Sequence, residues 1–227
     1  MYHSQVGQDK FLNEQVFNFK ENGFFIEVGA SDGIKHSNSL FFEESLGWTG
    51  ICIEPNPSAF MELKLNRECF VHECAIDIDD GFADFTKNVG YTEQLSGITK
   101  YYDPRQLSRI AEWIDGNADD GGVVNESGSS TTIKVATRRL DSILNEHQID
   151  YVDYISIDVE GAEISVLKSI DFDAVYVDVI GFEVNWSEPA LDTIEFLSSN
   201  GFVKLANVGQ DVFMINAQSK YVRGEIL

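Results

Sequence analysis

The chain has 227 residues, of which 43% are hydrophobic and 24% charged, and this composition excludes intrinsic disorder and suits one packed domain. The formal net charge of −22 argues against binding to nucleic-acid phosphates or anionic lipid and favours neutral or cationic ligands. Cys52, Cys69 and Cys74 lie among apolar residues, which predicts reduced thiols in a reducing compartment. Because no stretch approaches the ~18 apolar residues of a spanning helix, we expect a cytoplasmic protein without membrane insertion.

Strand-like and helix-like patterns alternate along the chain, which predicts an α/β protein with a mostly parallel sheet covered on both faces. The expected elements, in chain order, are a helix at 8–19, a strand at 24–28, a helix at 38–46, a strand at 51–54, a helix at 57–65, a strand at 70–75, a helix at 140–147, a strand at 154–158, a helix at 162–169, a strand at 177–183, a helix at 189–199 and a hairpin of strands at 202–208 and 212–216.

Residues 90–130 break this alternation, because they contain clusters of Gly, Ser, Asn and Asp. We expect a structureless, lid-like insertion within a single domain that spans residues 1–227. Tyr91, Tyr101 and Tyr102 fall in its first part and would cover a substrate. For the Gly/Ser/Asp part, a tolerated loop without a role is an equally good interpretation.

The strand expected at 24–28 ends in the sequence GASDG. Gly29 and Gly33 allow a tight turn and a close approach of the backbone to a ligand. The spacing is not the G-x-G-x-x-G of a dinucleotide loop, and the negative charges of Glu27 and Asp32 would repel a pyrophosphate. These charges would instead hold the ammonium and sulfonium groups of S-adenosylmethionine. An ordinary strand-to-helix turn is the alternative.

A second acid follows at the end of the next strand, where Glu54 stands 21 residues after Gly33. A carboxylate at this place accepts the ribose hydroxyls of adenosine cofactors in doubly wound folds. The third expected strand ends in Ala75, Ile76 and Asp77, which would line the adenine edge. The three features recur in the order that an adenosine-cofactor site requires.

Four segments resemble the FkbM family of S-adenosylmethionine-dependent methyltransferases: SQVGQD at 4–9, FFIEVGASDG at 24–33, HSNSLFFEESLGWTGICIEPNP at 36–57 and SIDVEGAE at 156–163. The resemblance covers almost the whole chain outside 90–130. It implies the class I methyltransferase fold, a seven-stranded sheet in the order 3-2-1-4-5-7-6 with strand seven antiparallel. It also implies O-methylation of a hydroxyl on a sugar, a polyketide or a related metabolite.

The resemblance further implies a cofactor site, position by position. The residues expected against the methionine half are Glu27, Gly29, Ala30, Asp32 and Gly33, with Gln8 and Asn38 at its carboxylate or ammonium. Glu54 would take the ribose, and Pro55, Asn56, Ala75 and Ile76 would flank the adenine, with Asp158 as a further cofactor contact. Ser39 stands where the family usually has Thr, which keeps the hydroxyl.

Asp158 and Glu183 end neighbouring expected strands, so their carboxylates would share a site, with Glu160 close behind. Such carboxylates could act as the general base for an acceptor hydroxyl, since crowding raises a pKa. Asp158 and Glu183 could also bind Mg²⁺ or Mn²⁺, although we favour no obligatory metal. His36, shortly after Gly33, is the other candidate base.

The favoured function is an S-adenosylmethionine-dependent O-methyltransferase that acts on a sugar hydroxyl of a small molecule, nucleotide sugar or glycan. An alternative is an inactive, cofactor-retaining domain that serves as a binding or scaffolding module, for example within a larger polypeptide. The presence of Asp158, Glu160 and Glu183 argues mildly against such a decayed site. A third alternative, a metal-dependent hydrolase, leaves the Gly29 loop and Glu54 without a purpose.

Overall fold

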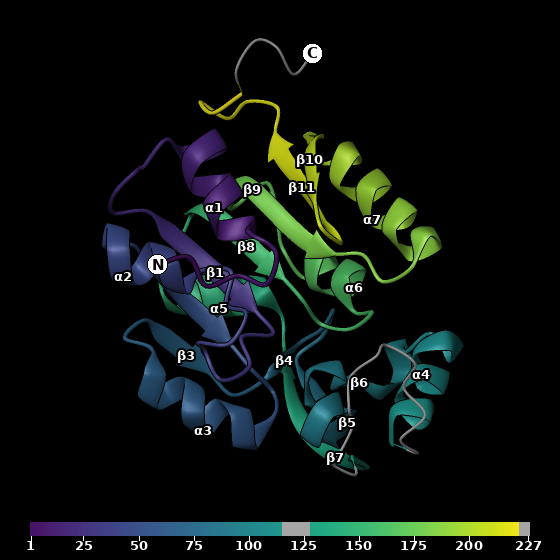
Figure 1. The fold of residues 1–227 in the computed structure, drawn as a ribbon. Coiled ribbons are helices and arrows are strands. Elements are labelled where there is room, and N and C mark those ends of the chain that lie inside the picture. Colours follow the sequence, from purple (N-terminus) through teal and green to yellow (C-terminus); the bar gives the residue numbers. More distant parts are fainter. Residues whose placement is uncertain (115–127, 223–227) are drawn as a thin grey trace.

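The central feature of the computed structural model, which describes residues 1–114 and 128–222, is a seven-stranded sheet (Figure 1). Its strands are β1 (Phe24–Val28), β2 (Thr49–Ile53), β3 (Phe70–His72), β8 (Tyr151–Ile157), β9 (Tyr176–Glu183), β10 (Phe202–Val208) and β11 (Asp211–Asn216). They lie in the order β10-β11-β9-β8-β1-β2-β3, and β11 runs antiparallel to both β9 and β10. This order confirms the expected class I methyltransferase fold.

Helices cover both faces of this sheet, because successive side chains of each strand point to opposite sides. Ile26 of β1 packs on one face with α5 (Leu140–Glu146), α6 (Glu163–Lys168) and α7 (Ser187–Ser199). Phe25 packs on the other face with the N-terminal helix, α2 (Leu40–Leu46) and α3 (Pro57–Asn66). The two resulting cores hold the strand ends in register at the carboxyl edge of the sheet.

Local sequence explains where several helices begin and end. The expected helix at 8–19 is an α-helix over Gln8–Phe11 (α1) and a π-helix over Leu12–Phe17, and it ends where Asn18 adopts a left-handed conformation at φ 49°. Helix α3 begins with Asn56, whose side chain accepts from the backbone N–H of Ser58, and with Pro57 at its first turn. Across both described stretches, no helix is long and apolar enough to cross a membrane.

A second sheet corrects two expectations. Its strands are β4 (Ala75–Ile76), β5 (Gly81–Val89), β6 (Gly97–Ile98) and β7 (Ser129–Arg138), in the order β4-β7-β5-β6. The expected strand at 70–75 is confirmed for Phe70–His72 and wrong beyond it, because the chain leaves the central sheet after His72 and Ala75–Ile76 pairs with β7.

The expectation of a structureless insertion at 90–130 is also wrong for the part that the structure describes. This part contains β6, helix α4 (Pro104–Ile114) and two 3₁₀ turns, over Gly90–Leu95 and Thr99–Tyr101. Residues 115–127 lie outside the described residues. In Figure 1 the second sheet and α4 lie beside the central sheet, at the lower right.

Asp77 attaches the inserted segment to the rest of the molecule. Its buried carboxylate accepts from Lys100 Nζ at 2.7 Å and from the Tyr101 hydroxyl at 2.6 Å. Asp77 is not among the residues that line the large cavity at the carboxyl edge of the sheet, although Ala75 and Ile76 of the same segment are. It holds the segment that follows β6 instead.

Candidate active site

A cavity of about 410 Å³ lies at the carboxyl edge of the central sheet. The structure brings nearly all the predicted site residues to its walls: Gln8, Glu27, Gly29, Ala30, Asp32, His36, Asn38, Glu54, Pro55, Asn56, Ala75, Ile76, Asp158, Glu160 and Glu183. Gly33 and Asp77 are not among the residues that line it. Part of the wall belongs to the inserted segment, through residues 93–98 and Arg109.

The two glycines of the GASDG loop have different roles. Gly29 has φ +86°, and a Cβ there would lie 1.8 Å from the backbone carbonyl oxygen of Asp158. Only glycine lets the loop after β1 pass so close to the end of β8. Gly33 has φ +81° but faces the side chains of Arg67 and Leu63. Gly33 therefore allows the loop to pack on Arg67, and its contact with the cofactor stays a prediction.

Glu27 is buried and fully engaged by the protein. Its carboxylate accepts from the hydroxyls of Ser37 at 2.8 Å and Ser39 at 2.6 Å, and from the backbone N–H of Asn38 at 2.7 Å. Arg67, also buried, lies 3.2 Å away and balances its charge. Glu27 therefore organises the 37–39 loop and does not supply the free negative charge that we expected.

The hydrogen bond from its backbone N–H to Glu27 positions Asn38 at the cavity. Its side-chain amide donates to the Ser156 hydroxyl at 3.0 Å, and its Oδ1 is buried without a hydrogen-bond partner in the described part of the chain. Because Asn38 lines the large cavity, this oxygen is an acceptor that a ligand donor, such as an ammonium group, would satisfy.

Glu54 is held at the other end of the cavity by two backbone N–H groups, those of Ser31 at 2.9 Å and Asn56 at 2.7 Å. Burial raises the pKa of its carboxyl to about 7, although both hydrogen bonds act in the opposite direction. Each carboxylate oxygen accepts more than one hydrogen bond, so Glu54 can still accept two hydroxyl groups from a ligand.

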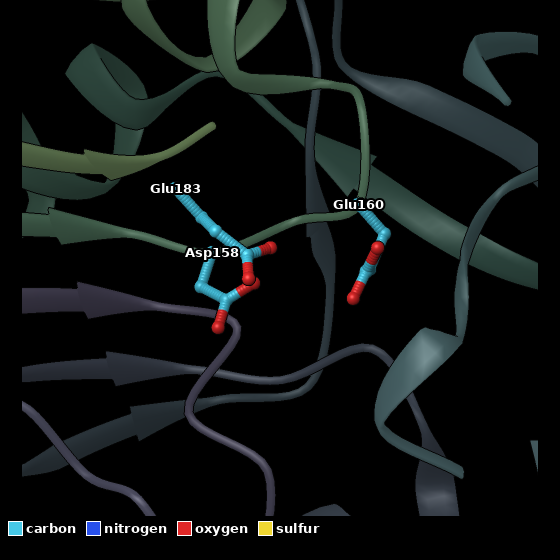
Figure 2. Close-up of side chains that lie close together, drawn as sticks. All are labelled: Asp158, Glu160 and Glu183. Carbon is cyan, nitrogen blue, oxygen red and sulfur yellow. The ribbon is translucent and has the colours of Figure 1, made fainter. Parts of the chain in front are cut away.

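Three further carboxylates converge beyond the ends of β8 and β9. One oxygen each of Asp158, Glu160 and Glu183 lies within 4.8 Å of the others, and Figure 2 shows Asp158 meeting Glu183 while Glu160 faces them from the following loop. Asn185 donates its amide to Glu183 at 2.7 Å and to Glu160 at 3.3 Å. Carboxylates suit a hard divalent cation in type, but amide N–H groups already occupy two of these three.

Burial raises the pKa values of these three carboxyls, which favours the uptake of a proton. Burial, followed by mutual repulsion, raises the pKa of Asp158 and of Glu160 well above the usual range, and burial raises that of Glu183. The positive charge of Arg109 opposes this rise at Glu160 and Glu183. A carboxyl with a raised pKa is a better general base near neutral pH.

Arg109 and Gln106 are functional candidates that the sequence did not reveal. Both belong to α4, and the Gln106 amide donates to Glu160 at 2.6 Å. The two residues are three positions apart and so share a helix face. The spacing of three residues could have indicated that Gln106 and Arg109 act together, but only if residues 104–114 were already known to form a helix.

His36 and Asp32 lie on the outer part of the GASDG loop. The residue His36 is exposed and has φ 60°, and partial desolvation of its ring, followed by the charge of neighbouring Lys35, lowers its pKa. Asp32 closes a turn by accepting from the backbone N–H groups of Ile34 and Lys35. Both line the cavity, but neither belongs to the carboxylate group.

A second, smaller cavity of about 130 Å³ adjoins the large one, and Glu160, Glu183 and Asn185 line both. Its other walls include Tyr101, Tyr102 and Gln106 from the inserted segment and Trp186 from the entry to α7. The Arg105 guanidinium lies 4.2 Å from the Trp186 ring centroid and connects the two walls. A cavity of this size accommodates about one six-membered ring, so the carboxylates stand between a cofactor-sized space and a ring-sized one.

Known proteins share both the sequence and the fold features of the chain. The family described as "Methyltransferase FkbM domain" matches residues 27–204. "Methyltransferase 1" of Beauveria bassiana (strain ARSEF 2860) is 23% identical over 177 residues, which are 74% of this chain and 66% of that protein.

Solved structures are similar at lower identity. The FkbM methyltransferase of Methylobacillus flagellatus KT has a TM-score of 0.49 and 14% identity, over 86% of this chain and 43% of that one. Aeropyrum pernix fibrillarin in complex with S-adenosyl-L-methionine has a TM-score of 0.42 and 11% identity, over 87% of this chain and 68% of that one. The chain thus spans less than half of the Methylobacillus protein.

Proposed function

The chain belongs to the FkbM family of S-adenosylmethionine-dependent methyltransferases, and from this premise we propose that it methylates a hydroxyl oxygen of a sugar, in a glycan or a nucleotide sugar. The observation that carries the proposal is the position of Glu160 and Glu183, which line both the cofactor-sized cavity and the ring-sized cavity, with Asp158 beside them on the cofactor side. A base is required at this point, because an aliphatic hydroxyl is a poor nucleophile until it loses its proton.

The residues of the large cavity fit S-adenosylmethionine. Gly29 lets the loop after β1 pass close to the end of β8 at the cavity wall, the free Oδ1 of Asn38 suits the ammonium group, and Glu54 suits the ribose hydroxyls. Ala75 and Ile76 offer apolar surface for the adenine. When bound, the cofactor supplies a methyl group on a positively charged sulfur.

The residues of the chain then have to place the acceptor oxygen and remove its proton. Tyr101, Tyr102 and Trp186 provide flat walls that suit one sugar ring. As the oxygen attacks the methyl carbon, its proton passes to the Asp158–Glu183 carboxylate pair, which Asn185 keeps oriented. Holding both reactants in this geometry supplies a large part of the rate enhancement.

Calorimetry and a methyl-transfer assay test this function. We expect S-adenosylmethionine to bind, and a panel of sugar acceptors to yield labelled product. Asp158→Asn and Glu183→Gln should lower turnover by about 10²–10⁴-fold, because each removes a proton acceptor, while the affinity for the cofactor is largely kept. Asp173→Asn, an exposed change in the turn before β9, is the matched control.

Three outcomes would contradict the proposal. An absence of cofactor binding up to millimolar concentration would remove the methyltransferase activity itself. Full turnover in Asp158→Asn and Glu183→Gln, with loss in His36→Gln, would move the base to His36. Loss of turnover in EDTA, restored by Mg²⁺ or Mn²⁺, would show that the carboxylates serve a metal ion.

A further inference from the structure

All the charged side chains among the described residues that line the smaller cavity are acidic. Its walls include the carboxylates of Asp103, Glu160, Glu163 and Glu183, whereas none of its described lining residues is a lysine, arginine or histidine. Asp103 is paired with Arg105 at 2.8 Å, and Glu163 accepts from the Gly161 N–H at 3.0 Å. Glu160 and Glu183 remain, and they receive amide hydrogen bonds from Gln106 and Asn185. Arg109, which lines the large cavity and not the smaller one, is the positive charge that acts on both.

A buried, unpartnered acceptor lines the same cavity. Gln106 is 2% exposed, its amide nitrogen donates to Glu160 at 2.6 Å, and its Oε1 has no hydrogen-bond partner among the described residues. An unsatisfied buried carbonyl costs free energy until a donor reaches it. The described lining therefore offers carboxylates and one unsatisfied acceptor without a cationic side chain, which suits a ligand that carries a positive charge and N–H donors.

The remaining walls favour an organic cation over a metal ion. Tyr101, Tyr102, Phe182 and Trp186 line the cavity, and aromatic faces attract ammonium groups. A divalent cation would instead need oxygen ligands, but the amide N–H groups of Gln106 and Asn185 already point at Glu160.

We propose that the acceptor is an amino sugar, whose protonated amine is held by Glu160 and the Gln106 side-chain oxygen beside the hydroxyl that is methylated. This inference rests on the proposed function and narrows its substrate class. In this arrangement Glu160 recognises the substrate, while Asp158, which lines only the large cavity, stays on the cofactor side.

Two sugars that differ in a single group test the proposal. Calorimetry with S-adenosylhomocysteine at saturation compares glucosamine with glucose at neutral pH, where the amine carries a proton. We expect glucosamine to bind at least about tenfold more tightly, which is a difference of about 1.4 kcal/mol. Glu160→Gln should reduce this ratio to about two or less, because it removes the charge and keeps the shape. Glu112→Gln removes an exposed charge from α4 that lines neither cavity, and it should leave the ratio unchanged.

Several results would overturn the inference. Equal affinity for the two sugars, no binding of either, or an unchanged ratio in Glu160→Gln would each contradict it, and so would amine binding that requires Mg²⁺. If Glu160→Gln does not fold, Gln106→Met gives a second test, since loss of the Oε1 acceptor should lower the ratio. Binding of S-adenosylhomocysteine is measured first, so a failure of the methyltransferase site is distinguished from a failure of the amine preference.

Discussion

Gly29 marks the closest approach between two backbone segments of the site. Gly29→Ala should unfold the protein or abolish cofactor binding, because its Cβ would lie 1.8 Å from the Asp158 carbonyl oxygen. Gly201 has the same φ of +86° but nothing within 4 Å of an added Cβ. Gly201→Ala should therefore cost only the backbone strain, about 1–2 kcal/mol. Thermal unfolding and calorimetry with the cofactor measure both variants, and equal losses would contradict the steric argument.

At the same scale, the sequence located most of the site but not its internal partners. Gly29, Asn38 and Glu54 reach the large cavity as expected, since each follows or ends a strand whose position the pattern predicts. The ion pair between Glu27 and Arg67 could not be predicted from the sequence, because only the fold brings together two residues that are 40 positions apart. Sequence spacing indicates which strand end a residue occupies; it does not indicate which buried charge will neutralise it.

Among the elements, Asp77 is a buried polar anchor that joins the end of β4 to the 3₁₀ turn after β6. Asp77→Asn removes the ion pair with Lys100 and weakens the bond from Tyr101, so it should cost about 1.5–3 kcal/mol of stability. We also expect a higher KM for the acceptor and a smaller change in cofactor affinity, since Tyr101 lines the smaller cavity. Urea unfolding and steady-state kinetics measure these effects.

The matched control for Asp77 lies in the same second sheet. Asp84 pairs with Lys134 at 3.2 Å, but both side chains are largely exposed. Asp84→Asn should change the stability by no more than about 1 kcal/mol. If Asp77→Asn were equally mild, the inserted segment would depend on its apolar contacts and not on this anchor.

The elements that the sequence predicted and those it missed differ in how locally they are encoded. The strands of the central sheet are short apolar runs bounded by turns, so their pattern suffices. Strand β7 contains the polar run SSTT and follows a Gly/Ser cluster, which is typical of a loop. It becomes a strand because it pairs with β5, from Gly81↔Thr137 to Val89↔Ser129, and no local pattern reveals a partner so distant.

Over the whole molecule, buried carboxyl groups with raised pKa values should make the unfolding free energy fall as pH rises. Burial raises the pKa of Glu54 from 4.5 to about 7 and that of Asp211 from 3.8 to about 6. The folded protein therefore binds more protons than the unfolded chain, and its unfolding free energy decreases from about pH 4.5 to about pH 7. Glu54 alone contributes about 3 kcal/mol to this decrease.

Urea unfolding at about pH 5 and about pH 7.5 measures the decrease in the cofactor-free protein. Glu54→Gln should make the difference between the two pH values smaller, whereas Glu68→Gln, at an exposed position, should leave it unchanged. Stability that rises across this range would show that Glu54 is ionised throughout in the folded state.

Strand β11 lies between β9 and β10 in the sheet, although it follows both in the chain. During synthesis β10 therefore has no neighbour to pair with until β11 has left the ribosome. Completion of the large cavity is delayed in the same way, because the side-chain amide of Gln8 donates to Asp211, which lies 203 positions later in the chain. A nascent chain that ends before β11 would carry the GASDG loop and Glu54 and yet lack one wall, so cofactor binding should begin only after nearly all of this sequence has been translated.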